Sequence, residues 1–190
     1  MQHPSNRYKS AMFPAFWTAI ITNIYISFVF LYIGAYSAII CPVSAVFIFL
    51  ICFSLLISDK INAKNSFLIA SYAVAIEVSI NTYFIGWDAG FFYFIFLLPA
   101  VFLLNSDWKI WITIVFNVTI ITLLLLLWYI FHNGLSLYPI DSNTQSIIYG
   151  MNATGTVLII IIVMIYFSRT IIKKDETLVM VNKALEKQNK

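Results

Sequence analysis

Residues 110–131 read IWITIVFNVTIITLLLLLWYIF and contain no charged side chain. A membrane hydrocarbon core about 30 Å thick is crossed by roughly 20 apolar helical residues, so this stretch is long enough to span a bilayer. The whole chain of 190 residues is 62% hydrophobic and 10% charged. That composition excludes a water-soluble domain and predicts an integral membrane protein.

Five further apolar segments meet or approach the same length. With residues 110–131 they give six predicted membrane helices, at 13–36, 38–57, 67–85, 89–104, 110–131 and 144–168. The fourth segment is short and contains Pro99, which predicts a helix that is tilted, kinked or shielded from lipid by its neighbours. We therefore predict an all-α integral membrane fold with six transmembrane helices.

The basic residues give an orientation. All eleven lysines and arginines precede the first segment, follow the last, or lie between the second and third or the fourth and fifth. The opposite connections, 34–42, 86–88 and 132–143, contain none. By the positive-inside rule both termini are expected in the cytoplasm of a bacterium, with the helices in its inner membrane. The charge indicates topology and predicts no nucleic-acid partner, and the third outer connection is long enough to fold over the bundle mouth.

Residues 169–190 are polar yet lack glycine and proline, so the sixth helix is expected to continue into the cytoplasm. Ile171, Leu178 and Leu185 recur at seven-residue spacing with Val181 between them, which is typical of a coiled-coil stripe. We predict a transmembrane domain at 1–168 and a signalling helix at 169–190 that pairs in a homodimer and begins the linker to a missing output domain. An amphipathic helix on the membrane surface is the alternative.

Glu77 is the ionisable residue placed deepest in a predicted membrane segment. An acid at the bilayer centre costs about 2.5–3.5 kcal/mol on insertion scales, so it is expected to face other helices. If the third helix stays regular, positions 77, 81, 84 and 88 share one face, bringing Asn81 and Asp88 into line with Glu77. Two interpretations stay open: a ligand or proton site with Glu77 at its floor, or a neutral glutamate that bonds Asn81 or another helix.

Other amides and the outer turn add candidates. Asn23, Asn117 and Asn152 lie within apolar segments, where hydrogen bonds between helices are expected. The stretch 86–93, GWDAGFFY, combines two glycines, an acid and four aromatics at the predicted membrane interface. The predicted sensing or ligand-binding residues are therefore Glu77, Asn81, Trp87, Asp88 and Tyr93.

Enzyme motifs are absent from the sequence. There is no Gly-rich phosphate loop, HExxH or GxSxG, and both histidines lie outside the apolar segments. Cys41 and Cys52 lack metal-ligand spacing and are interpreted as core-filling thiols. We predict no catalytic residue, no cofactor and no metal in this chain.

The pair Glu77-Val78, the turn GWDAGF at 86–91 and the run LLP at 97–99 resemble a known membrane module. It is the six-helix N-terminal region of bacterial GGDEF-type diguanylate cyclases and adenylate/guanylate cyclases, in which an acid in the third helix precedes a GW-D/S-x-GF turn. The tail NKALEKQNK at 182–190 is similar to the linker before such output domains. Family members often carry a histidine about a turn after the acid, where this chain has Asn81.

The resemblance implies a sensor module that responds to a small apolar ligand or to the surrounding lipid and regulates a nucleotide cyclase through a dimeric helix. Similar linkers also precede histidine kinase domains, so a kinase sensor is an alternative. A small transporter or proton-coupled carrier using Glu77 as a relay is a second. A third is a small membrane assembly protein whose tail binds a partner helix.

Overall fold

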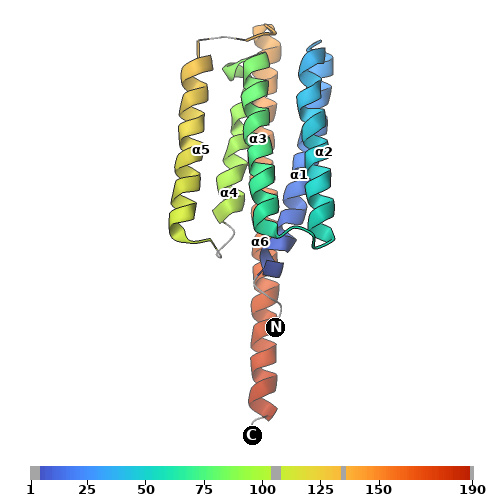
Figure 1. Ribbon diagram of the computed structural model, residues 1–190, viewed down its shortest axis with the longest axis vertical. Coiled ribbons are helices and arrows are strands. Elements are labelled where there is room, and N and C mark those ends of the chain that lie inside the picture. Colours follow the sequence, from blue (N-terminus) through green and yellow to red (C-terminus); the bar gives the residue numbers. More distant parts are fainter. Residues whose placement is uncertain (1–4, 104–107, 134–135, 189–190) are drawn as a thin grey trace.

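The computed structural model describes residues 5–103, 108–133 and 136–188, and this part of the chain contains helices and no strand. The helices run along one bundle axis (Figure 1). They are α1 (Ser5–Tyr32), α2 (Ile40–Ile57), α3 (Ala63–Ile85), α4 (Leu97–Leu103), α5 (Ile110–Phe131) and α6 (Ser142–Gln188), with short 3-10 helices η1 (Tyr36–Ile39), η2 (Trp87–Ala89) and η3 (Phe91–Phe96). The predicted all-α fold is confirmed.

Five stretches are long and apolar enough to cross a membrane: Met12–Tyr32, Tyr36–Ile57, Ala63–Ile85, Ile110–Phe131 and Ser142–Tyr166. Their outward faces carry large exposed apolar side chains. In α5, for example, only Ile120 and Leu127 are buried, while neighbours such as Leu125 remain exposed. Such surfaces suit hydrocarbon rather than water, so the chain is a multi-pass helical membrane protein in contact with lipid.

Two predicted helix boundaries were wrong at their ends. The first helix ends at Tyr32 rather than at 36, because the chain turns through Gly34 in a left-handed conformation (φ +75°). The third helix begins at Ala63 rather than at 67, because the Asn62 side chain accepts a hydrogen bond from the Asn65 amide at 2.8 Å. Such a cap starts a helix within polar sequence that hydropathy does not include.

The predicted fourth segment, 89–104, is not one regular helix. It begins in η2, passes through η3 and becomes α4 only at Leu97, so the irregular part precedes Pro99. Pro99 lies in the first turn of α4, where its missing N–H removes no helical hydrogen bond. The apolar stretch Phe91–Phe102 is shorter than the five long spans. The predicted shielding is confirmed, since this segment contributes buried Phe91, Phe94, Ile95, Leu98, Val101 and Phe102.

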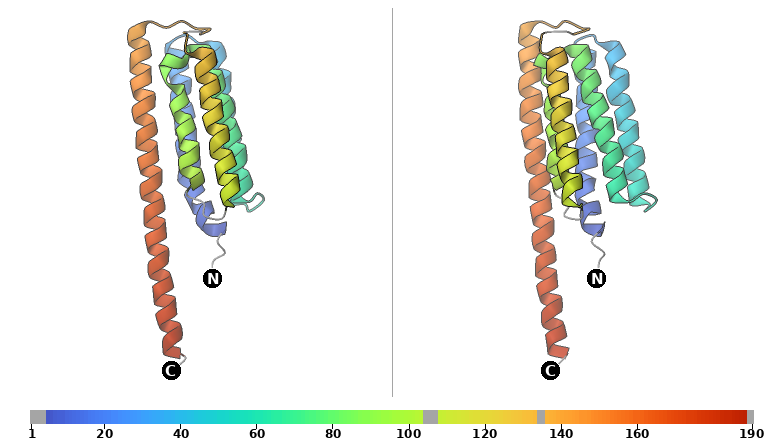
Figure 2. Two further views of the ribbon diagram at one scale, coloured as in Figure 1. Left: turned by 90° about the vertical axis from the view of Figure 1, so that its left-hand side faces the viewer. Right: turned by 60° about the vertical axis from the view of Figure 1, so that its left-hand side comes forward.

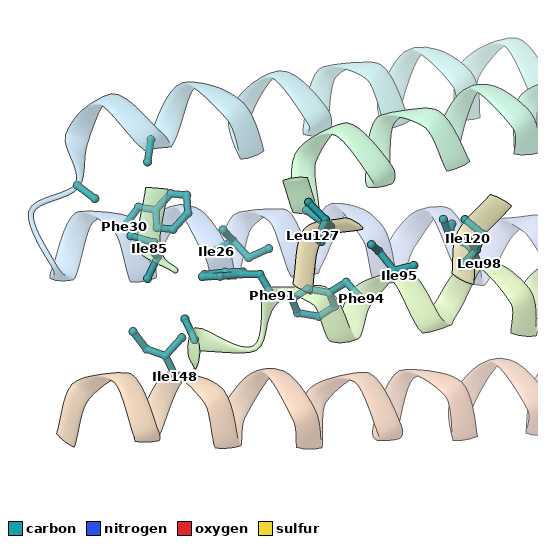
Figure 3. Close-up of a cluster of buried hydrophobic side chains, with 14 residues drawn as sticks. Ile26, Phe30, Ile85, Phe91, Phe94, Ile95, Leu98, Ile120, Leu127 and Ile148 are labelled. Carbon is teal, nitrogen blue, oxygen red and sulfur yellow. The ribbon is translucent and has the colours of Figure 1, made fainter. Parts of the chain in front are cut away.

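The outer half of the bundle is held together by an apolar cluster to which the fourth segment contributes most (Figure 3). Phe91 lies against Phe30 of α1, with ring centroids 5.6 Å apart. Labelled members from the other helices are Ile26, Ile85, Ile120, Leu127 and Ile148. A second cluster fills the inner half, where Phe102 stacks on Phe116 at 4.3 Å. The fourth segment thus connects both halves of the core.

Helix α6 is the longest element, with 47 residues, or about 70 Å at 1.5 Å per residue. It extends well past the end of the bundle at which the N-terminus lies (Figures 1 and 2), so the predicted continuation as a helix is confirmed. The backbone at Ile171, Leu178, Val181 and Leu185 belongs to this helix, but their side chains lie outside the part that the structure describes.

The start of α6 is capped by Asp141. Its carboxylate accepts hydrogen bonds from the backbone amides of Thr144 at 2.9 Å and Asn143 at 3.1 Å. The Thr144 side chain, followed by these amides, lowers the pKa of Asp141 below its usual range. The stability that this cap adds is present above the ordinary aspartate pKa and is lost as the pH falls through the lowered one.

Candidate functional site

Glu77 and Asn81 lie one turn apart on α3 and are buried, with 5% and 0% of their surfaces exposed. The Asn81 Nδ2 atom donates to Glu77 Oε1 at 3.4 Å, which is long for a hydrogen bond. Asn23 of α1 is close enough to interact with the same carboxyl through its side chain. These three residues form a polar cluster between α1 and α3, as expected for an acid that cannot face lipid.

Asp88 does not join this cluster, and the predicted alignment of positions 77, 81, 84 and 88 was wrong. Helix α3 ends at Ile85, because Gly86 adopts φ +102°, a conformation that interrupts the helix and is open mainly to glycine. Asp88 therefore lies in η2 with an exposed side chain. The regular spacing on which the alignment depended stops three residues before the acid.

Trp87 and Tyr93 belong to a separate aromatic group in the outer turn 86–93. The Trp87 ring stacks on Phe92 with centroids 4.0 Å apart and planes 5° from parallel. The Tyr93 hydroxyl bonds the Tyr149 hydroxyl of α6 at 2.5 Å. The five predicted residues thus fall into two groups, one inside the bundle and one at its outer end.

The outer turn also holds α6 through a buried amide. Asn152 Nδ2 donates to the Ala89 carbonyl at 2.8 Å, and neither residue is exposed. This confirms the predicted bond between helices for Asn152. For Asn117 that prediction was wrong, because its amide donates to the Thr113 carbonyl of its own helix at 2.7 Å.

A groove lies between α2 and α3, with a cavity volume of about 420 Å³. Glu77 contributes to its lining, and apolar side chains from both helices form most of the wall. Ile40 and Ile76, which also line it, are 70% and 59% exposed on the outer surface of the bundle. In a membrane this groove therefore opens sideways towards lipid, with a single carboxyl in its depth.

The connection between α5 and α6 folds back over the end of α3. The amides of Leu137 and Tyr138 donate to the carbonyls of Tyr83 and Phe84 at 3.3 and 2.8 Å. The Tyr138 hydroxyl also bonds the hydroxyl of Ser37. Ser37 and Phe84 line the groove, so this strap, residues 136–138, lies across its outer end, as the length of the third outer connection allowed.

Comparisons of the chain with protein-family models, with curated proteins and with solved structures give no match. The function therefore rests on the residues and their geometry. No sequence signal identified Tyr138, Tyr149 or Ser37 as parts of the site, because single hydroxyls near a membrane interface are common and only the folded connection brings these three to their partners.

Replacing Tyr138 with phenylalanine should loosen the strap without removing its ring. One neutral hydrogen bond contributes about 0.5–1.5 kcal/mol, so exchange of the Tyr138 amide proton is expected to accelerate about 2- to 10-fold. Hydrogen exchange followed by mass spectrometry in nanodiscs would measure this. Tyr129→Phe is the control, since Tyr129 is 72% exposed on α5. Equal exchange in the two variants would show that the hydroxyl contact does not hold the strap.

Proposed function

We propose that this chain is the membrane-embedded sensor module of a bacterial signalling protein, and that it transmits its signal through α6. One observation carries the proposal. Helix α6 is unbroken from Ser142 to Gln188, and its outer end is bonded to the turn that directly follows the Glu77-bearing helix. A change at the buried acid therefore has a short covalent and hydrogen-bonded route to a helix that leaves the bundle.

The attachment of α6 to the bundle is narrow, which supports a helix that can rotate or slide. Its buried residues inside the bundle form a single stripe, Ile148, Asn152, Thr156 and Val163. The faces beside this stripe are exposed, with Leu158 and Ile162 more than half accessible. A helix held along one seam loses few contacts when it turns, and helix shifts of this kind are a common signalling transition.

Unsatisfied polar atoms beside Glu77 favour more than one arrangement of this region. The side-chain oxygens of Asn23 and Asn81 are buried without a hydrogen-bond partner. Each such acceptor costs about 1–3 kcal/mol, so a shift of α1 against α3 that pairs them recovers free energy lost elsewhere. A ligand or lipid change that prefers one arrangement would then shift the population.

The proposed topology has six crossings. The chain leaves α3 at the outer end and enters α5 at the opposite end, and α4 lies between them (Figure 1). The segment formed by η3 and α4 is about 22 Å long, which is short for a bilayer but sufficient where neighbouring helices cover it. Both termini then lie on the side that carries the basic residues, the cytoplasm of an inner membrane.

The proposed stalk, residues 169–188, pairs with a second copy. An isolated helix of about 20 residues is marginal in water, and the seven-residue spacing of Ile171, Leu178 and Leu185 supplies the apolar seam that a coiled coil needs. A parallel dimer would set the spacing of two output domains. By resemblance the output is a nucleotide cyclase of the diguanylate or adenylate/guanylate type, with a histidine kinase as the alternative.

A chimera tests the function. Residues 1–188 are joined to a diguanylate cyclase catalytic domain, and product formation is measured in membranes. Glu77→Gln and Asp88→Asn are expected to change the activity within the range of about 5- to 150-fold that allosteric coupling covers, with unchanged membrane insertion. Asn81→Leu should act in the same way, whereas Asn117→Leu is the matched control because its amide bonds only its own helix. Unchanged activity in the first three variants would remove the proposed site.

A further inference from the structure

The groove between α2 and α3 has the size and chemistry of a ligand site. Its volume of about 420 Å³ falls in the range of roughly 300–1,000 Å³ found for small-molecule pockets. Its mouth, between the exposed side chains of Ile40 and Ile76, opens on the face that contacts lipid. A molecule can therefore enter from the membrane without crossing the bundle.

Four polar side chains line the groove, and two of them already have partners. Ser44 donates to the Ile40 carbonyl at 2.7 Å, and Ser37 bonds the Tyr138 hydroxyl. The other two are Cys41, a weak hydrogen-bonding group, and Glu77, which lies near enough to act electrostatically on the Cys41 thiol. The carboxyl is the strongest acceptor in the groove, so it complements a ligand that donates a hydrogen bond.

The depth of Glu77 limits what that donor can be. Glu77 precedes the outer end of α3, Ile85, by eight residues or about 12 Å. The headgroup of a two-chain phospholipid stays at the interface and does not extend that far. A charged amine is costly at this depth, whereas a hydroxyl loses much less on leaving water.

We infer that the groove binds a single-chain aliphatic alcohol from the surrounding membrane, with its hydroxyl donating to Glu77 and its chain against the isoleucines of α2 and α3. This inference rests on the proposed function and names the ligand class of the same site. The strap, residues 136–138, closes the outer end of the groove through Ser37 and Phe84. The occupant accordingly leaves by the lateral mouth.

Protection of Cys41 tests the assignment. In nanodiscs containing the Cys52→Ala protein, Cys41 is the only thiol, and its alkylation by N-ethylmaleimide is followed by mass spectrometry. At a 1-dodecanol concentration ten times its dissociation constant, alkylation is expected to slow about tenfold. Dodecane at the same membrane loading is the matched probe without a hydroxyl and should not protect. Equal effects of the two compounds would overturn the inference.

Three variants locate the bound probe. Glu77→Leu should abolish protection by dodecanol. Ile76→Trp narrows the mouth and should weaken protection, whereas Ile114→Trp on α5 should not, because Ile114 is exposed to the same extent, 58% against 59%. The thermal unfolding midpoint gives a readout independent of thiol chemistry, with a rise in dodecanol for the unmodified protein and none for Glu77→Leu. Protection or a midpoint rise that survives Glu77→Leu would contradict the site.

The two proposals fail separately. If dodecanol neither protects Cys41 nor raises the unfolding midpoint, the alcohol class is wrong. A Glu77→Gln effect on the activity of the cyclase chimera would in that case still support a sensor module. If dodecanol binds but no variant changes cyclase activity, the groove is a lipid site without a signalling role.

Discussion

Insertion of one alanine between Ser168 and Arg169 is expected to change the activity of the cyclase chimera within the range of about 5- to 150-fold. One residue turns the rest of a helix by about 100°. Because α6 is continuous across this position, the insertion rotates the whole stalk relative to the bundle. Output domains held by a paired stalk would then meet in the wrong register.

The control is an insertion of seven residues, which returns the stalk to within about 20° of its original face. Its activity should return towards that of the unmodified chimera. Single cysteines report the pairing directly, since substitutions at Ile171, Leu178 or Leu185 should cross-link between copies more readily than one at Asn182. Equal cross-linking at all four, together with equal activity in the one- and seven-residue insertions, would argue against a paired stalk.

Gly90→Ala is expected to destabilise the bundle more than any other single methyl added in the outer turn. Gly90 adopts φ +74°, where a side chain costs about 1–2 kcal/mol. A Cβ atom there would also lie 3.0 Å from Tyr149 Cδ2 and 3.2 Å from Tyr93 Cδ2. Displacing packed rings adds about 1–3 kcal/mol, and the two tyrosines belong to the contact that holds α6.

Gly34→Ala separates the two effects. Gly34 has nearly the same conformation, φ +75°, but nothing lies within 4 Å of an added Cβ. The difference between the two variants in the free energy of unfolding, measured by circular dichroism in mixed micelles, isolates the contact with the tyrosines. If both variants lose the same stability, the Tyr93–Tyr149 contact is not tightly packed.

The long apolar helices were predictable because hydropathy measures the dominant free energy of membrane insertion. The buried position of Glu77 followed from the same argument. The division of the fourth segment was not predictable, because 89–104 is apolar throughout and hydropathy does not distinguish a 3-10 from an α-helix. The left-handed Gly86 and Gly90 determine where that segment turns, and a glycine in the sequence does not reveal its own φ.

The site was predicted in part. Glu77 and Asn81 were placed together correctly, since residues four apart share a helix face. Asp88 was misplaced because that rule holds only while the helix continues. The hydroxyl contacts of Tyr138 with Ser37 and of Tyr149 with Tyr93 join residues far apart in sequence, and no local pattern encodes such pairs.

The signalling mechanism depends most directly on α4 crossing the membrane, because this crossing gives six spans and a cytoplasmic stalk. Single cysteines in a protein lacking Cys41 and Cys52 test it through labelling with a membrane-impermeant maleimide in intact spheroplasts. We predict that Asp88→Cys and His132→Cys react from outside, and that Lys60→Cys and Lys109→Cys react only after the membrane is opened. Labelling of Lys109→Cys in intact spheroplasts would place the start of α5 outside and contradict the account.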